Sequence, residues 1–171
     1  MIKLIIFDLD GVLTSAKEIH YRTLNTAIET IAGKEFVINR NEHESIYDGM
    51  DTRSKLRKLT DVKGLPANSH EDIWDLKQQL TLEAFDYIQR NERLVYMIQT
   101  LGKKYKLACA TNSIHKTAIR QLSKIGIGNM FDDIVCSDDV PCPKPHSYMY
   151  LLCMLNAEAN PDETLIIEDS V

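Results

Sequence analysis

The chain has 171 residues, of which 44% are hydrophobic, and its formal net charge is −5. This length and apolar content suffice for one domain, or one domain with an insertion, to bury a core, and they exclude a disordered or fibrous protein. The acidic balance and the lack of a long Lys or Arg run argue against nucleic acid or an anionic membrane surface as a partner. We therefore expect a small-molecule partner, no nucleic acid and no membrane.

No stretch approaches the roughly 20 apolar residues that a membrane-spanning helix requires. The apolar opening over residues 1–7 runs directly into acidic residues, unlike a secretion signal with its small-residue cleavage site. The four cysteines are scattered without a CxxC pair, which indicates neither a zinc site nor a disulfide framework. These features favour a cytoplasmic protein with reduced cysteines.

The first predicted strand is the apolar run over residues 3–7, which stops at Asp8-Leu9-Asp10-Gly11. Such a run is typical of a parallel strand that is buried on both faces. Three later apolar runs also end in polar residues, over 107–110, 134–136 and 165–167. Helical spacing over 114–125 and 148–155 alternates with them, so we predict an α/β fold with a three-layer α/β/α Rossmann-like core and a parallel sheet.

The region from about residue 18 to residue 90 breaks this rhythm because it contains no convincing strand. Helices are predicted there over 19–31, 52–59 and 72–88, separated by a polar stretch at 39–44 and a Gly64-Leu65-Pro66 turn. A further helix over 93–101 leads back into the sheet. We therefore expect an inserted all-helical cap over residues 17–89, and a catalytic core formed by residues 1–16 and 90–171.

Two carboxylates, Asp8 and Asp10, stand where the first strand ends, which is the edge at which parallel sheets bind ligands. The turn at Gly11 frees Asp10 to swing toward the target of Asp8. Phosphoryl transfer from a monoester needs a nucleophile, neutralisation of the phosphoryl charge and an acid for the leaving alcohol. An Asp-x-Asp-Gly string also occurs in acidic turns and calcium loops, so the assignment depends on the later strand ends.

The segment Phe7-Asp8-Leu9-Asp10-Gly11-Val12-Leu13 resembles motif I of the haloacid dehalogenase superfamily. Polar residues at the later strand ends resemble its other motifs in the expected order: Thr111 with Asn112 (motif II), Lys144 between two prolines (motif III), and Glu168 with Asp169 (motif IV). The resemblance spans residues 4–171 and places the helical insertion between the first two motifs. The chain is thus similar to the capped phosphoglycolate phosphatase and β-phosphoglucomutase-like members.

This resemblance implies that Asp8 attacks phosphorus to form an aspartyl phosphate, while Asp10 protonates the departing alcohol and then activates water. It also implies that Thr111 and Asn112 hold the phosphoryl oxygens and that Lys144 supplies a compact positive charge. Read without the family, Thr111 and Asn112 suit the cap of the next helix, a role compatible with holding phosphate, and the alternative for Lys144 is a plain surface lysine.

The resemblance further implies a Mg²⁺ ion bound by Asp8, the backbone carbonyl of Asp10, Glu168 and Asp169, whose oxygen atoms are the ligands that Mg²⁺ prefers. Without the family, the last two residues are simply exposed acids that end a strand.

In the predicted cap, His20 resembles a position where many capped relatives carry a His that faces the active site. Gly49 and Arg53 resemble the substrate-specificity loop, where an arginine would pair with a distal phosphate or carboxylate of the substrate. A surface histidine and a solvated arginine are equally plausible readings of these residues. Lys77 on the long predicted helix offers another cation, although an exposed face is its ordinary place.

Two departures from the family pattern are visible. Ser15 stands where the capped subfamily usually has an aspartate, and the chain stops at residue 171, where relatives continue through another helix and strand. The second departure predicts an exposed sheet edge that invites a fusion partner domain or self-association. The expected function is a Mg²⁺-dependent phosphatase acting on a small phosphorylated metabolite; the alternatives are a sugar phosphomutase and a non-catalytic phosphate-binding module or fragment.

Overall fold

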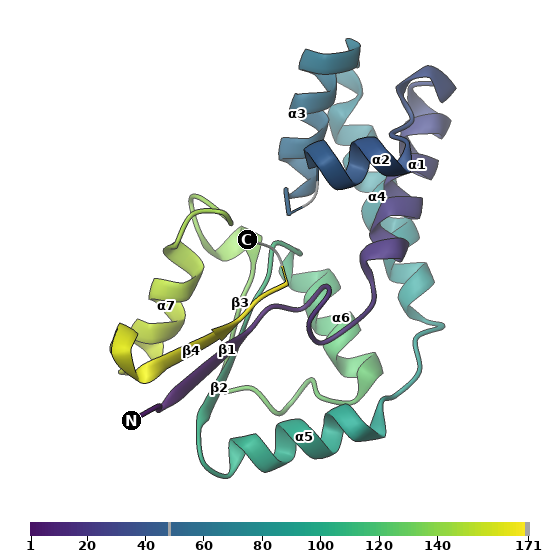
Figure 1. The fold of residues 1–171 in the computed structure, drawn as a ribbon. Coiled ribbons are helices and arrows are strands. Elements are labelled where there is room, and N and C mark those ends of the chain that lie inside the picture. Colours follow the sequence, from purple (N-terminus) through teal and green to yellow (C-terminus); the bar gives the residue numbers. More distant parts are fainter. Residues whose placement is uncertain (48, 170–171) are drawn as a thin grey trace. The chain divides into compact units, whose positions relative to one another are not determined.

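A computed structural model describes residues 1–47 and 49–169 of the chain. The chain divides into two compact units (Figure 1). The core unit comprises Met1–Ala16 and Phe85–Val171, and the helical unit comprises Lys17–Ala84. We describe each unit by itself.

The core unit is built on a four-stranded parallel sheet in the order β3-β2-β1-β4. Its strands are β1 (Leu4–Phe7), β2 (Lys106–Ala110), β3 (Asp133–Val135) and β4 (Thr164–Ile167). In register, Ile5 of β1 lies between Leu107 of β2 and Leu165 of β4. All four residues of β1 are buried, as expected for a strand with neighbours on both sides and helices on both faces.

Three helices cover the two faces of this sheet: α5 (Glu92–Gly102), α6 (His115–Ile125) and α7 (Tyr148–Asn156). Ile5 and Phe7 point into an apolar cluster with residues of α5 and α6, whereas Leu4 and Ile6 point into a second cluster with α7. Figure 1 shows α7 across the sheet from α5 and α6. The α/β/α layers predicted from the sequence are therefore confirmed.

The edge strand β4 carries two partly exposed apolar side chains, Leu165 at 46% and Ile166 at 39%. In the described sheet this strand pairs only with β1. Apolar surface at an unpaired edge favours association. Binding of another domain, or of a second copy, at this edge stays a prediction.

The helical unit contains no strand among its described residues. Its longer helices are α1 (Lys17–Ile31), α3 (Thr52–Lys63) and α4, which runs from His70 to Phe85. They enclose a separate apolar cluster that includes Leu24, Ile28, Leu59 and Ile73. Shorter helical turns complete this unit: α2 (Arg40–Glu42), a π-helix at His43–Tyr47, and 3₁₀ turns at Lys34–Phe36 and Ala67–Ser69. The core unit has 3₁₀ turns at Ser137–Asp139 and Pro161–Glu163.

The structure differs from the sequence prediction in the polar stretch at 39–44, where α2 and the π-helix stand in place of a loop. Asn39 explains this helix because its side chain accepts a hydrogen bond from the Glu42 N–H while Glu42 reaches back to the Asn39 N–H. The predicted helix over 72–88 also ends earlier, at Phe85. Asn91 then caps α5 through the Leu94 N–H.

None of the helices that the structure describes combines the length and the apolar content needed to span a bilayer. The cysteines are all free thiols; Cys142 is exposed and the other three are buried.

Candidate active site

Asp8 is the first residue after β1, and the sheet fixes its backbone because its N–H donates to the Ile167 carbonyl at 2.9 Å. Its side chain is buried, with the residue only 6% exposed, and its Oδ1 lies 2.7 Å from the Lys144 Nζ. Burial raises the pKa of Asp8 to about 6, although the Lys144 charge opposes this shift. The carboxylate is thus poorly solvated but remains ionised at neutral pH.

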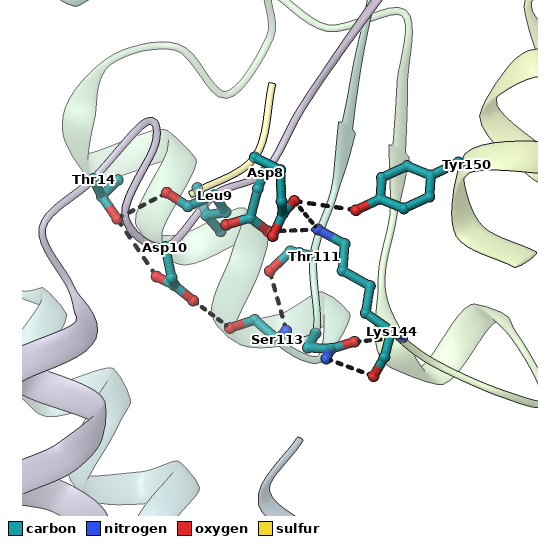
Figure 2. Close-up of polar contacts among 10 residues, drawn as sticks. Asp8, Leu9, Asp10, Thr14, Thr111, Ser113, Lys144 and Tyr150 are labelled. Carbon is teal, nitrogen blue, oxygen red and sulfur yellow. Dashed lines mark hydrogen bonds and ion pairs between the residues drawn. The ribbon is translucent and has the colours of Figure 1, made fainter. Parts of the chain in front are cut away.

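Lys144 places its ammonium between two carboxylates (Figure 2). The Nζ atom lies 2.7 Å from Asp8 Oδ1 and 2.8 Å from Glu168 Oε2. Tyr150 donates from its hydroxyl to the same Glu168 oxygen at 3.1 Å, and its ring lies 5.2 Å from the ammonium. Burial lowers the pKa of Lys144, but the two carboxylates outweigh burial and raise it above its usual range. A fixed positive charge therefore stands beside Asp8.

The loop that carries Lys144 is held by the loop that follows β2. Asn112 Oδ1 accepts from the Lys144 N–H at 2.9 Å, and Asn112 Nδ2 donates to the Lys144 carbonyl at 3.1 Å. Thr111 is buried, and its hydroxyl oxygen accepts from the Ser113 N–H at 3.1 Å. Neither side chain caps α6; the carboxylate of Asp138 takes the His115 N–H at 2.9 Å instead.

Asp10 directs its carboxylate toward α6 and the loop after β2, not toward Lys144 (Figure 2). Its Oδ1 accepts from the Gln121 amide at 2.9 Å, and its Oδ2 accepts from the Ser113 hydroxyl at 3.2 Å. The chain turns sharply after Asp10, since Gly11 has φ 108°.

The carboxylates of Asp8, Glu168 and Asp169 each offer an oxygen atom, and these atoms lie within 4.8 Å of one another. Asp8 is buried, Glu168 is half-buried and Asp169 is exposed. Three carboxylate oxygens this close together have the chemistry of a Mg²⁺ site, so these residues fit the ion that the family resemblance implies.

A second such group comprises His115, Cys136, Asp138 and Asp139. Its carboxylates are engaged in backbone hydrogen bonds, from His115 N–H to Asp138 and from Cys136 N–H to Asp139. These bonds explain their proximity without an ion.

The remaining predicted residues, His20, Gly49 and Arg53, belong to the helical unit. Arg53 makes a two-pronged ion pair with Glu71, with N–O distances of 2.8 and 2.9 Å, and its guanidinium lies 4.7 Å from the centre of the Trp74 ring. The geometry therefore gives Arg53 a partner inside its own unit. A substrate contact for these three residues stays a prediction.

Three residues that the sequence reasoning missed contact the site residues: Ser113, Gln121 and Tyr150. Ser113 directly follows the pair that resembles motif II, and this position indicated that it lies at the site. Gln121 was signalled by its place among apolar residues of a predicted helix, at a spacing that points inward. No sequence signal distinguished Tyr150 from an ordinary core residue of the helix over 148–155.

Comparison with known proteins identifies the family of the chain. The profile of the haloacid dehalogenase-like hydrolases matches residues 5–171. A phosphorylated carbohydrates phosphatase of Thermotoga maritima is 23% identical over 167 residues, which cover 97% of this chain and 76% of the relative. Pyrophosphatase PpaX of Bacillus mycoides is 26% identical over 173 residues, covering 99% of this chain and 75% of the relative.

The fold also matches solved structures. The crystal structure of β-phosphoglucomutase from Clostridium difficile superposes with a TM-score of 0.84 at 22% identity, covering 99% of this chain and 77% of that chain. The protein is a member of the haloacid dehalogenase-like hydrolase family. It is accordingly a hydrolase of this family, and the residues that resemble the four family motifs follow the strands of its parallel sheet.

Proposed function

We propose that the protein is a Mg²⁺-dependent phosphatase that hydrolyses a small phosphorylated metabolite through an aspartyl phosphate on Asp8. The observation that carries this proposal is the environment of Asp8: a buried carboxylate beside the Lys144 ammonium, within 4.8 Å of two further carboxylates.

The chain supplies a group for each task in phosphoryl transfer. Asp8 is the nucleophile, and Lys144 places positive charge where the phosphoryl oxygens gather. Thr111 and Asn112 belong to the loop after β2 that holds those oxygens, which we call the phosphoryl loop. Asp10 protonates the leaving alcohol. Asn112 also fixes the Lys144 backbone, so that the phosphoryl loop and the cation are positioned together.

A bound Mg²⁺ ion would be held by Asp8, Glu168, Asp169 and the backbone carbonyl of Asp10, and would neutralise charge between the carboxylates and the phosphate. The names of relatives that act on phosphorylated carbohydrates and pyrophosphate support a phosphorylated substrate without defining which one.

The test is phosphate release from a panel of sugar phosphates, phosphoglycolate, nucleotides, pyrophosphate and p-nitrophenyl phosphate, with Mg²⁺ and with a chelator. Asp8→Asn should abolish release, and Asp10→Asn should reduce it strongly. Asp162→Asn is the matched control, because it makes the same chemical change in an exposed turn of the core unit.

Release that depends on Mg²⁺ and on Asp8 supports the phosphatase. Conversion of a sugar phosphate to a positional isomer, without free phosphate, indicates the phosphomutase alternative. Phosphate binding without any turnover contradicts both and indicates the non-catalytic alternative.

A further inference from the structure

Gln121 is a polar residue in an apolar place. It lies on α6 with 0% of its surface exposed, among the buried residues Ala118, Leu122 and Ile125 of the same helix. Burying an amide side chain costs free energy unless its polar atoms form hydrogen bonds. The hydrogen-bond partners of Gln121 therefore decide what its burial costs.

The amide of Gln121 faces Asp10 and its surroundings. Its Nε2 donates to Asp10 Oδ1 at 2.9 Å and also contacts the hydroxyl of Thr14. Its Oε1 has no hydrogen-bond partner among the described residues, although it is buried. Because an ionised carboxylate only accepts hydrogen bonds, the NH₂ group must be the end that faces Asp10. In the core, the Gln121 amide thus has hydrogen-bond partners for its NH₂ group, which faces Asp10, and none among the described residues for its oxygen.

The two oxygens of Asp10 have different surroundings. Oδ1 receives Gln121 and lies 3.5 Å from the Thr14 hydroxyl, on the side of α6. Oδ2 receives the Ser113 hydroxyl, whose own backbone N–H donates to Thr111 in the phosphoryl loop. Oδ2 is therefore the oxygen on the side of the phosphoryl loop (Figure 2). A hydroxyl such as that of Ser113 donates or accepts, so this contact suits both protonation states of Oδ2.

We propose that Gln121 is a positioning residue that acts through Asp10: it holds Oδ1, so that Oδ2 is the atom that gives its proton to the leaving alcohol. This inference rests on the proposed phosphatase function. In the step concerned, an Asp8 oxygen forms a bond to phosphorus while the bond from phosphorus to the alcohol oxygen breaks. The electron pair of that bond stays on the alcohol oxygen, which takes the proton from Asp10 Oδ2.

Loss of this positioning should depend on the leaving group. A sugar alcohol is a weak acid and needs a proton as it departs, whereas p-nitrophenolate is stable as an anion and needs little help. The ratio kcat/KM reports the reaction up to release of the alcohol, so it isolates this step from later hydrolysis of the aspartyl phosphate.

The experiment compares kcat/KM for p-nitrophenyl phosphate and for glucose 6-phosphate in the wild type and in Gln121→Met, which keeps the side-chain length but removes the amide. We expect a loss of roughly 10- to 100-fold for glucose 6-phosphate, the size typical of a misplaced catalytic group, and less than about 3-fold for p-nitrophenyl phosphate. The loss should fall mainly on kcat, because Gln121 acts through Asp10 and does not contact the substrate.

Gln121→Leu is the second variant, since it is apolar, close to glutamine in size and places no hydrogen-bond donor or ionisable group beside Asp10. It should show the same selective loss, and it serves alone if the methionine variant does not fold. Thr117→Val is the matched control: it removes another hydrogen bond of a buried α6 residue, from the Thr117 hydroxyl to the Ile114 carbonyl, which does not involve Asp10. Any effect of this control should be equal for the two substrates.

Equal losses on both substrates in a folded Gln121 variant would overturn the inference, because they indicate a general disturbance of the core. Unchanged or increased activity on glucose 6-phosphate would overturn it as well. If the wild-type protein does not hydrolyse glucose 6-phosphate, the alkyl phosphate of the panel that it hydrolyses fastest takes its place in the comparison. Absence of turnover by the wild-type protein on the whole panel is a separate result, which rejects the proposed function and, with it, the premise of this inference.

Discussion

At the scale of single residues, the central feature is the buried ammonium of Lys144 between Asp8 and Glu168. Without it, two carboxylates would face each other in a poorly solvated site, and an approaching phosphate would meet only negative charge. The length of the lysine side chain and the compact shape of its ammonium both matter here, because together they let Nζ reach both carboxylate oxygens at hydrogen-bond distance.

Lys144→Met should therefore lower phosphate release by about 10²- to 10³-fold, the usual result of removing one preorganised charge or donor. Lys144→Arg should not restore it, because the planar guanidinium does not fit the space of an ammonium. Steady-state kinetics checks both variants against Lys106→Met, an exposed lysine at the start of β2. Activity within a few-fold of the wild type in Lys144→Arg would contradict this account.

A second prediction concerns the pH dependence of stability without metal. The pKa of Asp8 is raised to about 6 in the folded protein from 3.8, so the fold favours the protonated form. The stability that this provides is present below about pH 4 and is lost as the pH rises through 6. Asp8→Asn mimics the neutral form and escapes this loss.

In chelator-containing buffer, Asp8→Asn should thus match the wild type near pH 4 and exceed it by roughly 2–3 kcal/mol above pH 7, since each pKa unit corresponds to about 1.4 kcal/mol. Urea denaturation across this pH range measures the difference. The exposed Asp162→Asn should show no such trend, and a wild type that is the more stable protein at pH 7 would sink the idea.

At the scale of elements, the strands and most helices were predictable because each apolar run ends in polar residues and each helix carries an inward apolar face. The order of the strands was not, since spacing along the chain does not encode which strands pair. The capping box from Asn39 to Glu42 was present in the sequence, but the polar composition of that stretch masked it. Boundaries were the weakest predictions, as at Phe85.

The site, too, was predictable only in part. Residues that match a motif were predictable one by one, whereas their mutual contacts join segments far apart in the chain. The hydrogen bonds between Asn112 and the Lys144 backbone, and between Gln121 and Asp10, arise only after the sheet brings the loops together. No periodicity carries that information.

Two helix ends provide a matched test of local geometry. Gly64 ends α3 and Gly126 ends α6, both in the left-handed conformation. A Cβ atom at Gly64 meets nothing within 4 Å, whereas one at Gly126 would lie 2.8 Å from Arg90 Nη1 and 2.9 Å from its Cγ. Strain alone acts at the first position, and strain together with crowding acts at the second.

Gly64→Ala should cost about 1–2 kcal/mol of stability through the backbone alone. Gly126→Ala should cost about 0.5–1.5 kcal/mol more, because the exposed Arg90 side chain must leave its rotamer to admit the Cβ atom. Chemical denaturation measures each loss, and the excess at Gly126 should disappear when Arg90→Ala is added. Equal losses in the two single variants would show that Arg90 yields without cost.

At the scale of the whole molecule, each unit has its own apolar cluster, with Ile28 fully buried in the helical unit and Ile6 fully buried in the core unit. Separate clusters predict separate stability. Truncating a buried isoleucine to alanine costs about 2–5 kcal/mol, which is a large share of the stability of a small unit.

Ile28→Ala should therefore accelerate amide hydrogen exchange in α1, α3 and α4 while the amides of β1 and β2 keep their protection. Ile6→Ala should accelerate amide hydrogen exchange in β1 and β2 and should not slow exchange anywhere. Hydrogen exchange with mass spectrometry on peptides from each unit resolves the two cases. Equal acceleration in both units by either variant would mean that they unfold as one.

The core unit is discontinuous in the sequence, and this has a consequence for how the protein is made. The helical unit is one continuous segment, so it can fold as soon as it has left the ribosome. Strand β1 is synthesised first, yet its neighbours β2 and β4 come much later, so it must wait unpaired with its apolar residues uncovered. Asp8 is therefore translated well before its partners Lys144 and Glu168, which lie far later in the chain. The nascent chain thus exposes the apolar residues of β1 until β2 and β4 have been made, and in that interval β1 is a segment that a chaperone can bind.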